Sequence, residues 1–342
     1  MNDHAALMRA LGAREHLDAE TMAFAIGAMM DAQWSEAQMA EFLTALASKG
    51  ETVDEVVGAA EAMRARSLRV DHTLRTVVDT CGTGGDGAHT INISTAAGFV
   101  VAGTGLPVAK HGNRAASSRC GSADVLEASG IPIDTTPEGA RAALEKTNFT
   151  FMFAQAYHPS MKAVGPVRSR LGVRTVFNLL GPLTNPAGAT SQVIGVADPA
   201  HLELLGVALE RLGGRAGAII HSSSGLDEIG GDAPSDVYQF GRDSVRRWRL
   251  DPAEFGVTAS REDLAGGSPA ENAAALRAIL EGERSPRAEV VALNAALALL
   301  VAEHVESLLE GLLRARKSLA DGSAHAVFDA ARNAGKPKME IA

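Results

Sequence analysis

The sequence predicts an α/β protein with a small N-terminal all-helical domain and a large α/β domain, whose mostly parallel central sheet is flanked by helices. Residues 1 to about 70 carry apolar side chains at helical spacing and show no strand pattern. From about Leu74, short apolar runs alternate with helical patterns, which is typical of a parallel sheet covered on both faces. We therefore expect the helical domain at 1–72 and the α/β domain at 73–342.

Four helices are predicted in the N-terminal domain, at His4–Leu11, Asp18–Met30, Ser35–Ser48 and Thr52–Ser67. Ser35 with Gln38, and Thr52 with Glu55, match the pattern of a capping box. Gly50 follows the third helix as a stop. Their apolar stripes either form only the core of this domain or, because four short helices make a thin core, also pack against a second subunit.

The second domain is predicted to contain strands at Arg75–Val78, Val108–Ala109, Ile131–Ile133, Phe149–Phe153, Ser191–Val196 and Ala216–Ile220. A hairpin is expected at Val237–Phe240 and Val245–Leu250, about Gly241-Arg242-Asp243. The predicted helices are Ser94–Val101, Ser122–Ser129, Pro137–Thr147, Met161–Leu171, Pro199–Leu212, Pro269–Leu280, Arg287–Val301 and Val305–Asp321. The final residues are expected to be a frayed end.

Composition and charge narrow the class of protein. The formal net charge is -9, which argues against nucleic acid as the main partner. No apolar run of about 18 residues is free of charges, and no signal peptide is evident, so we expect no membrane span and a cytoplasmic location. Two cysteines, Cys81 and Cys120, do not make a disulfide framework and are expected to be reduced.

The stretch most typical of a binding site runs from Asp79 to Asp124. A short buried strand at Thr76–Val78 leads into a glycine-rich turn at 82–87, and a helix from Ser94 follows, opened by a hydroxyl cap. Glycines let the backbone approach a phosphate, and the free amides at a helix N-terminus favour negative charge. This order of elements predicts an anion site at the carboxyl edge of the sheet.

Charge placement indicates the kind of anion. No Asp or Glu occurs from Gly87 through Ala123, an interval that contains Lys110, Arg114 and Arg119. A cationic segment in an acidic protein favours a small, highly charged ligand. The turn formally satisfies GxGxxG, but a dinucleotide site expects an acidic residue about 20 positions later, where Lys110 stands instead, and no GxxxxGK[ST] loop exists.

These motifs resemble those of the anthranilate phosphoribosyltransferase family, glycosyltransferases (pentosyltransferases) of tryptophan biosynthesis. The resemblance covers nearly the whole chain in the family's order. It rests on Gly82-Thr83-Gly84-Gly85-Asp86, Asn92-Ile93-Ser94-Thr95, Lys110-His111-Gly112-Asn113-Arg114, His158-Pro159, Arg168, Asn178-Leu179-Leu180-Gly181-Pro182, Leu226-Asp227-Glu228 and Glu271-Asn272-Ala273-Ala274.

The resemblance implies Mg²⁺-dependent transfer of the 5-phosphoribosyl group from phosphoribosyl pyrophosphate (PRPP) to the amine of anthranilate. The donor carries about five negative charges, so catalysis would depend on amides, cations, metal and positioning, without a nucleophile or acid–base residue. The resemblance also implies a homodimer through the helical domain. A segment at about 160–185 would return to that domain and close over the site.

The family's site residues are carried over position by position. For PRPP they are Gly82, Gly84, Gly85, Asp86, Thr90, Asn92, Ile93, Ser94, Thr95, Lys110, His111, Gly112, Asn113, Arg114, Ala115, Ala116, Ser117, Ser118 and Ser122. For anthranilate they are Gly82, Asn113, His158, Arg168 and Gly181. For two Mg²⁺ ions per subunit they are Ser94, Asp227 and Glu228, whose oxygen ligands suit this ion.

Two other functions fit parts of this pattern. A pyrimidine nucleoside phosphorylase shares this architecture but needs no metal pair, so Asp227 and Glu228 argue against it. A paralogue that has lost catalysis and binds nucleic acid would predict a basic surface and altered motifs, whereas this chain is acidic and its motifs are intact. Gly230–Ala233 departs from the Ile-Ser that the resemblance leads us to expect after Asp227 and Glu228. This difference bears on the conformation of the loop and not on the two carboxylates as ligands.

Overall fold

The structure, a computed structural model, describes residues 3–115, 118–241 and 244–334. Its centre is a seven-stranded sheet. The strands are β1 Val78–Gly82, β2 Val108–Gly112, β3 Phe149–Phe153, β4 Ser191–Gly195, β5 Ala216–Ser222, β6 Ser235–Gly241 and β7 Ser244–Leu250. They lie in the order β3-β2-β1-β4-β5-β6-β7, with β1 to β5 parallel and β6 and β7 antiparallel. The predicted α/β class with a mostly parallel sheet is confirmed.

The N-terminal helices are α1 His4–Gly12, α2 Ala19–Met30, α3 Glu36–Lys49 and α4 Val53–Ala65. Ser35 and Thr52 form the two predicted capping boxes, and Gly50, at φ +88°, ends α3. A buried ion pair joins α3 to α4, since Lys49 Nζ lies 2.9 Å from Glu55 Oε2. Glu55 also accepts from the backbone N–H of Leu17, so its charge is compensated within the bundle.

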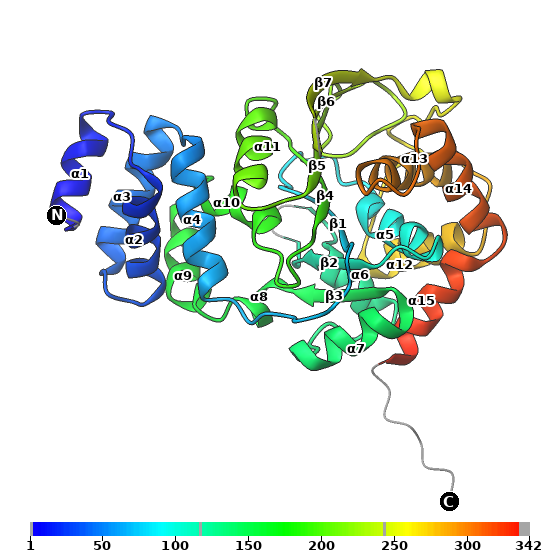
Figure 1. Ribbon diagram of the computed structural model, residues 1–342, viewed down its shortest axis with the longest axis horizontal. Helices are drawn as coiled ribbons and strands as arrows, with labels where there is room; N and C mark the ends of the chain where they lie inside the picture. The colour runs from blue at the N-terminus through cyan, green and yellow to red at the C-terminus, as the bar shows by residue number, and fades with distance from the viewer. Residues whose placement is uncertain (1–2, 116–117, 242–243, 335–342) are drawn as a thin grey trace, which may run out of the picture.

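A later segment returns to these helices. It comprises α8 Ala154–Tyr157, α9 Met161–Leu171, α10 Phe177–Leu180 and the 3₁₀ turn η1 Gly181–Leu183. Figure 1 shows α9 and α10 beside α2 and α4. Val164, Val167 and Phe177 share one hydrophobic core with the N-terminal helices. The same core continues to one face of the sheet, so the division at residue 72 stays a prediction.

The remaining helices cover the sheet. They are α5 Ile93–Gly103, α6 Ser122–Ala128, α7 Pro137–Thr147, α11 His201–Arg211, the 3₁₀ turn η2 Pro252–Phe255, α12 Pro269–Leu280, α13 Pro286–Val301, α14 Leu308–Ala320 and α15 Ser323–Ala334. Figure 1 shows α11 on the side of the helical bundle and α5, α13 and α14 on the opposite side. α5 packs against the sheet by stacking Phe99 on Phe149, with ring centroids 4.0 Å apart. Both faces are therefore buried, which explains the apolar strands.

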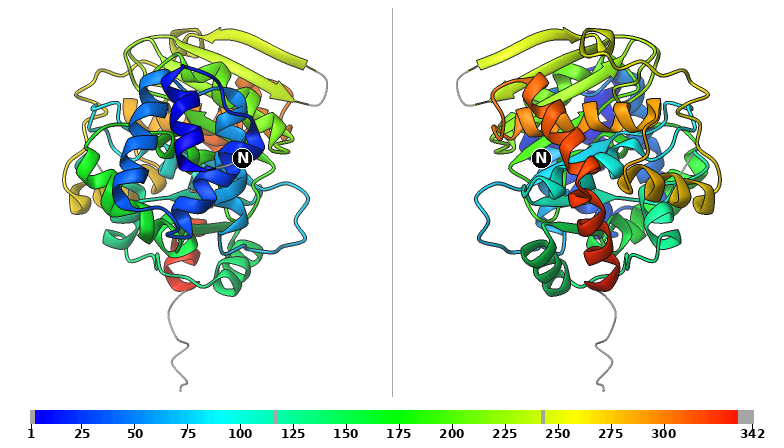
Figure 2. Two further views of the ribbon diagram at one scale, coloured as in Figure 1. Left: turned by 90° about the vertical axis from the view of Figure 1, so that its left-hand side faces the viewer. Right: turned by 90° about the vertical axis from the view of Figure 1, so that its right-hand side faces the viewer.

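The β6–β7 ribbon extends one edge of the sheet, and Figure 2 shows it from both ends of the molecule. It corresponds to the predicted hairpin, although Arg242 and Asp243 of the expected turn lie outside the described residues. Within the described ranges, no helix is long and apolar enough to cross a membrane.

Three local predictions were wrong. β1 begins at Val78 and runs through the polar Asp79-Thr80-Cys81, because Asp79 and Thr80 find hydrogen-bond partners inside the protein. Ile131–Ile133 is not a strand: the N–H of Ile131 bonds to Leu126 and closes α6 instead. Part of the expected frayed end forms α15, whose Phe328 is fully buried against Phe99.

Candidate active site

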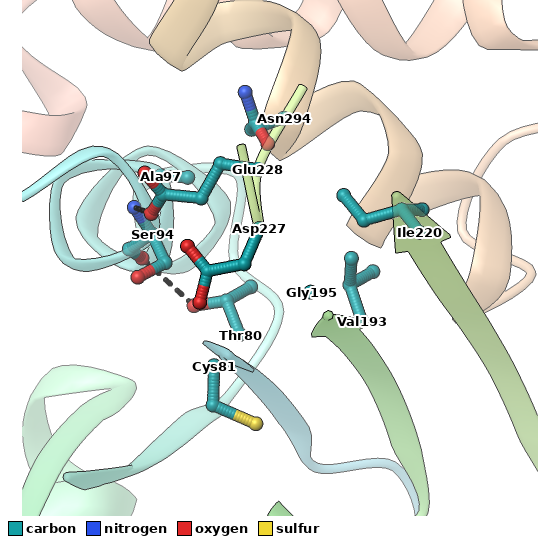
Figure 3. Close-up of a pocket in the computed structure, with 10 residues that line it drawn as sticks. All are labelled: Thr80, Cys81, Ser94, Ala97, Val193, Gly195, Ile220, Asp227, Glu228 and Asn294. Carbon is teal, nitrogen blue, oxygen red and sulfur yellow. Dashed lines mark hydrogen bonds between the residues drawn. The ribbon is translucent and has the colours of Figure 1, made fainter. Parts of the chain in front are cut away.

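The candidate site lies where the carboxyl ends of β1, β4 and β5 meet. The loop after β5 brings Asp227 over the ends of β1 and β4, as Figure 3 shows. This approach requires glycine at two strand ends: a Cβ on Gly82 would overlap the Asp227 carboxylate, and one on Gly195 would overlap its carbonyl. Loops at this edge of a parallel sheet are the usual place for a ligand site.

The carboxylate pair is held by backbone amides of the predicted anion site. The N–H of Gly84 donates to Asp227 Oδ2 at 2.8 Å, and the N–H of Ser94 donates to Glu228 Oε1 at 2.7 Å. Ser94 stands in the first turn of α5, so Glu228 occupies the positive end of this helix. The predicted hydroxyl cap is wrong, because the N-cap residue is Asn92, whose side chain makes no capping bond.

Electrostatics at the pair favour a bound cation. Burial, with Asp86 close by, raises the pKa of Asp227 to about 6. Burial, with Asp227 as its neighbour, raises the pKa of Glu228 to about 8. These carboxyl groups crowd together, and a divalent ion would relieve their repulsion.

The donor set fits Mg²⁺ in particular. In the described part of the chain, no three His, Cys, Asp or Glu side chains are placed to enclose a metal. Two carboxylates and the Ser94 hydroxyl make an open, all-oxygen set. Mg²⁺ is commonly held by one or two carboxylates and completes its shell with water and phosphate oxygens. The predicted ligands Ser94, Asp227 and Glu228 are therefore brought together, while the number of ions stays a prediction.

Lys110 lies beneath this pair. Its side chain is 2% exposed, and Nζ donates to the Thr80 carbonyl and, at 3.4 Å, to Ser94 Oγ. Asp79 balances its charge and accepts from Asn185 Nδ2 at 2.8 Å. Burial raises the pKa of Asp79 to about 6, against the opposing effect of Lys110. The Lys110 ammonium group thus places a positive charge beside Ser94, at the start of α5.

A second group of residues predicted to bind PRPP lies on the loop after β2. Arg114 pairs with Asp124 at 2.9 Å and with Glu127 at 2.8 Å, so its charge is already matched. The N–H groups of Ala115 and Gly121 both donate to Asp124 Oδ2 at 2.9 Å. Asp124 therefore holds this loop in place through hydrogen bonds to two of its backbone amides and an ion pair with Arg114.

The other residues predicted for the donor lie around these two groups. Asn92 links the loops, since it donates to the Cys120 carbonyl at 3.1 Å and accepts from Asn272 at 2.9 Å. Ser122 Oγ donates to the Asn113 carbonyl at 3.3 Å. Thr90 pairs with Ala265 in an isolated bridge. Ala116 and Ser117 lie outside the described residues.

The residues predicted for anthranilate lie toward the returning segment. His111 Nδ1 is 3.0 Å from the Gly181 carbonyl oxygen, and the ring centroids of His111 and His158 are 5.1 Å apart. A Cβ on Gly181 would meet open space. The Arg168 guanidinium lies 5.4 Å from the centre of the Phe177 ring, and burial lowers its pKa. Among the described residues, no side-chain hydrogen bond or ion pair joins Arg168 to another predicted site residue.

Sequence reasoning missed Asn294 on α13. Its side chain is 5% exposed and binds both backbone groups of Ile229: Oδ1 accepts from the N–H at 3.1 Å, and Nδ2 donates to the carbonyl at 2.9 Å. Asn294 thereby fixes the chain one residue after Glu228, and Figure 3 shows it above the pair. The available signal was a single Asn in a helix of Ala, Leu and Val.

Comparisons with known proteins agree with this arrangement. Residues 5–67 match the family described as "Glycosyl transferase family, helical bundle domain", and residues 74–325 match "Glycosyl transferase family, a/b domain". The helical bundle, the sheet and the site at its carboxyl edge thus define a glycosyl transferase of this two-part class.

Individual relatives narrow this class. The anthranilate phosphoribosyltransferase of Symbiobacterium thermophilum is 48% identical, over 96% of both chains, and that of Pelotomaculum thermopropionicum is 50% identical, over 91% of this chain and 90% of the relative. The chain belongs to the anthranilate phosphoribosyltransferase family.

Solved structures give the same result. The crystal structure of anthranilate phosphoribosyltransferase from Thermus thermophilus has a TM-score of 0.91 and 42% identity, covering 98% of this chain and 99% of that one. The Saccharomyces cerevisiae enzyme in complex with PRPP and Mg has a TM-score of 0.90 and 25% identity, covering 97% of both chains.

The buried histidine pair predicts a loss of stability in acid. Burial lowers the pKa of His111 to about 3 and that of His158 to about 4. Both therefore stay neutral in the folded protein while the unfolded chain binds protons below pH ~6.5, so stability falls as the pH drops from there. We expect a loss of about 2 kcal/mol per histidine at pH 5, measured by urea unfolding.

The double variant H111Q/H158Q separates this effect from other acid-sensitive groups. Its unfolding free energy should change less between pH 7 and pH 5 than that of the wild-type chain, because neither position can then be protonated. Parallel pH profiles of the two proteins would contradict the prediction.

Proposed function

We propose that this chain transfers the 5-phosphoribosyl group of PRPP to the amine of anthranilate, giving N-(5-phosphoribosyl)anthranilate and pyrophosphate. The carrying observation is the contact of Asp227 and Glu228 with the amides of Gly84 and Ser94. It joins an acidic pair to a glycine loop and a helix N-terminus, as a Mg²⁺-bound diphosphate requires. Membership of the family supports the same reaction.

In this proposal the donor lies against the loop that follows β1 and the loop that follows β2. Amides and hydroxyls of Gly84 to Asp86, Asn92 to Thr95 and Arg114 to Ser118 hold the phosphate oxygens, while Lys110 adds charge from below. Asp227, Glu228 and Ser94 would hold two Mg²⁺ ions, whose charge would offset that of the diphosphate leaving group. The yeast enzyme in complex with PRPP and Mg supports this choice of ligands.

Anthranilate would lie between the donor and the returning segment. Arg168 is suited to its carboxylate because a guanidinium pairs with planar anions in a bidentate manner, and here it has no carboxylate partner among the described residues. The open space beside Gly181 leaves room for the ring, with Gly82, Asn113 and His158 at its edge. The aromatic amine is neutral, so placement at C1 of the ribose carries the rate.

We further propose that residues 1–72, with the segment at 160–185, form the wall that closes over the site and carry a homodimer contact. Phe24 of α2 is 39% exposed and would contribute to that contact. A cytoplasmic protein without nucleic-acid or membrane partners agrees with the acidic composition. The intact carboxylate pair of Asp227 and Glu228 does not favour either alternative, pyrimidine nucleoside phosphorolysis or nucleic-acid binding.

Anthranilate fluorescence should decay when the chain is mixed with PRPP and Mg²⁺, because the free amine is consumed. Excess EDTA should abolish the decay, and added Mg²⁺ should restore it. Fluorescence that stays constant in the presence of Mg²⁺ and both substrates would overturn the proposed function. Phosphorolysis of thymidine or uridine by the same preparation would favour the phosphorylase.

Glu228→Gln should lower turnover about 100-fold or more and raise the Mg²⁺ concentration needed for half-maximal rate, since a neutral amide is a weaker ligand. Direct titration with Mn²⁺, followed by electron paramagnetic resonance, should show the same loss of affinity. Glu203→Gln, on the exposed surface of α11, is a matched control. An unchanged metal requirement would remove Glu228 from the metal site.

Arg168→Lys should raise the KM for anthranilate about 10-fold or more, because an ammonium group cannot pair with a carboxylate through two parallel bonds. The KM for PRPP should stay within about twofold of the wild-type value. Steady-state kinetics with each substrate varied in turn gives both constants. A rise in the PRPP constant alone would place Arg168 at the other substrate.

A further inference from the structure

In the part of the chain that the structure describes, few cationic side chains at the proposed PRPP site are free of a partner. Of the two cationic side chains assigned to the donor, Lys110 is buried and bonded to Thr80 and Ser94, and Arg114 is paired with Asp124 and Glu127. The pair Asp227 and Glu228 adds negative charge. A diphosphate that carries several negative charges needs further cationic hydrogen-bonding groups that face it.

Arg174 is such a cationic group, and it lies on the returning segment, across the site from the glycine loop. It stands between α9 and α10 on the returning segment, with an exposed side chain. Its Nη1 donates to the Gly84 carbonyl at 3.2 Å. No carboxylate lies within ion-pair distance of Arg174 in residues 3–115, 118–241 or 244–334, so its charge is unmatched.

The contact with Gly84 brings Arg174 close to the carboxylate pair Asp227 and Glu228. The Gly84 carbonyl accepts a hydrogen bond from Arg174, and the Gly84 N–H donates to Asp227 Oδ2 at 2.8 Å. A single residue therefore lies between the guanidinium and a proposed Mg²⁺ ligand. The guanidinium also lies where a Cβ on Gly85 would be, and Gly85 adopts φ +81°. Glycine at this position therefore leaves room for the arginine as well as for the turn.

The backbone beside Arg174 is anchored. The N–H of Thr175 donates to Asn178 Oδ1 at 2.9 Å, and Val176 and Phe177 are buried in the core shared with the N-terminal helices. The guanidinium is thus presented to the glycine loop by the helical side of the molecule. A ligand that binds both would hold the two sides together.

We propose that Arg174 is a diphosphate-binding residue, whose guanidinium exchanges the Gly84 carbonyl for oxygens of the PRPP diphosphate and neutralises the pyrophosphate as it leaves. This assignment rests on the proposed function. The step forms no covalent bond: one neutral acceptor is replaced by an anionic one, and hydrogen bonds between charged groups are about twice as strong as neutral ones. The arginine makes donor binding depend on contact between the returning segment and the glycine loop.

The test uses the full chain with Arg174→Gln, Arg174→Lys and the control Arg170→Gln. Arg170 lies four residues earlier, is also exposed and pairs with Glu36 at 2.5 Å, away from the loop. Isothermal titration with Mg²⁺ and inorganic pyrophosphate gives affinity without turnover. Steady-state kinetics gives the KM for each substrate, and thermal unfolding reports on folding.

Arg174→Gln should weaken pyrophosphate binding and raise the PRPP KM by about 10- to 100-fold, with the anthranilate KM and the melting temperature unchanged. Arg174→Lys should recover part of the affinity, and Arg170→Gln should match the wild-type chain. Pyrophosphate affinity within about twofold of wild type in Arg174→Gln overturns the inference. So does an equal rise of both KM values with a lower melting temperature, which a structural role would produce.

The inference and the proposed function can fail separately. Wild-type turnover of PRPP with anthranilate tests the function. Comparing pyrophosphate affinity between the wild-type chain and Arg174→Gln tests the arginine whether or not anthranilate is the acceptor.

Discussion

Two backbone amides, those of Gly84 and Ser94, hold the carboxylates of Asp227 and Glu228, and this contact joins the loops that follow β1 and β5. The two loops are far apart in the chain, since 134 positions separate Ser94 from Glu228. Amides that favour an anion here meet the side chains that favour a cation. The proposed phosphate and magnesium sites would thereby share this contact.

The surroundings of this contact are fixed by the core on two sides. Below it, Lys110, Asp79 and Asn185 form a buried polar network, in which each charge has a partner. Behind it, Asn294 fixes the chain after Glu228 through two backbone hydrogen bonds. Buried polar groups of this kind are costly unless satisfied, so the geometry of the site is specified by the core.

The opposite side of the site is of a different kind. The returning segment meets the glycine loop through an exposed arginine, Arg174, and a hydrogen bond of 3.2 Å. Exposed polar contacts contribute little to stability, because water competes for both partners. A carboxylate pair held by two backbone amides thus faces an exposed arginine, and in the proposed function a charged ligand would supply the interactions that hold the two sides together.

The sequence by itself determined the class of fold and most elements, because capping boxes, helix-stop glycines and apolar periodicity act locally. It also indicated a phosphate loop, while the acidic pair was identified only through the resemblance to the family. The tertiary structure decided which groups meet: that Lys110 is buried beneath α5, that Arg114 is matched by Asp124, and that Asn294 and Arg174 reach the site. These contacts join residues on different elements, so no local pattern encodes them. For the same reason β1 continues through Asp79, whose side chain is bonded by the N–H of His111 and the amide of Asn185, both on other segments.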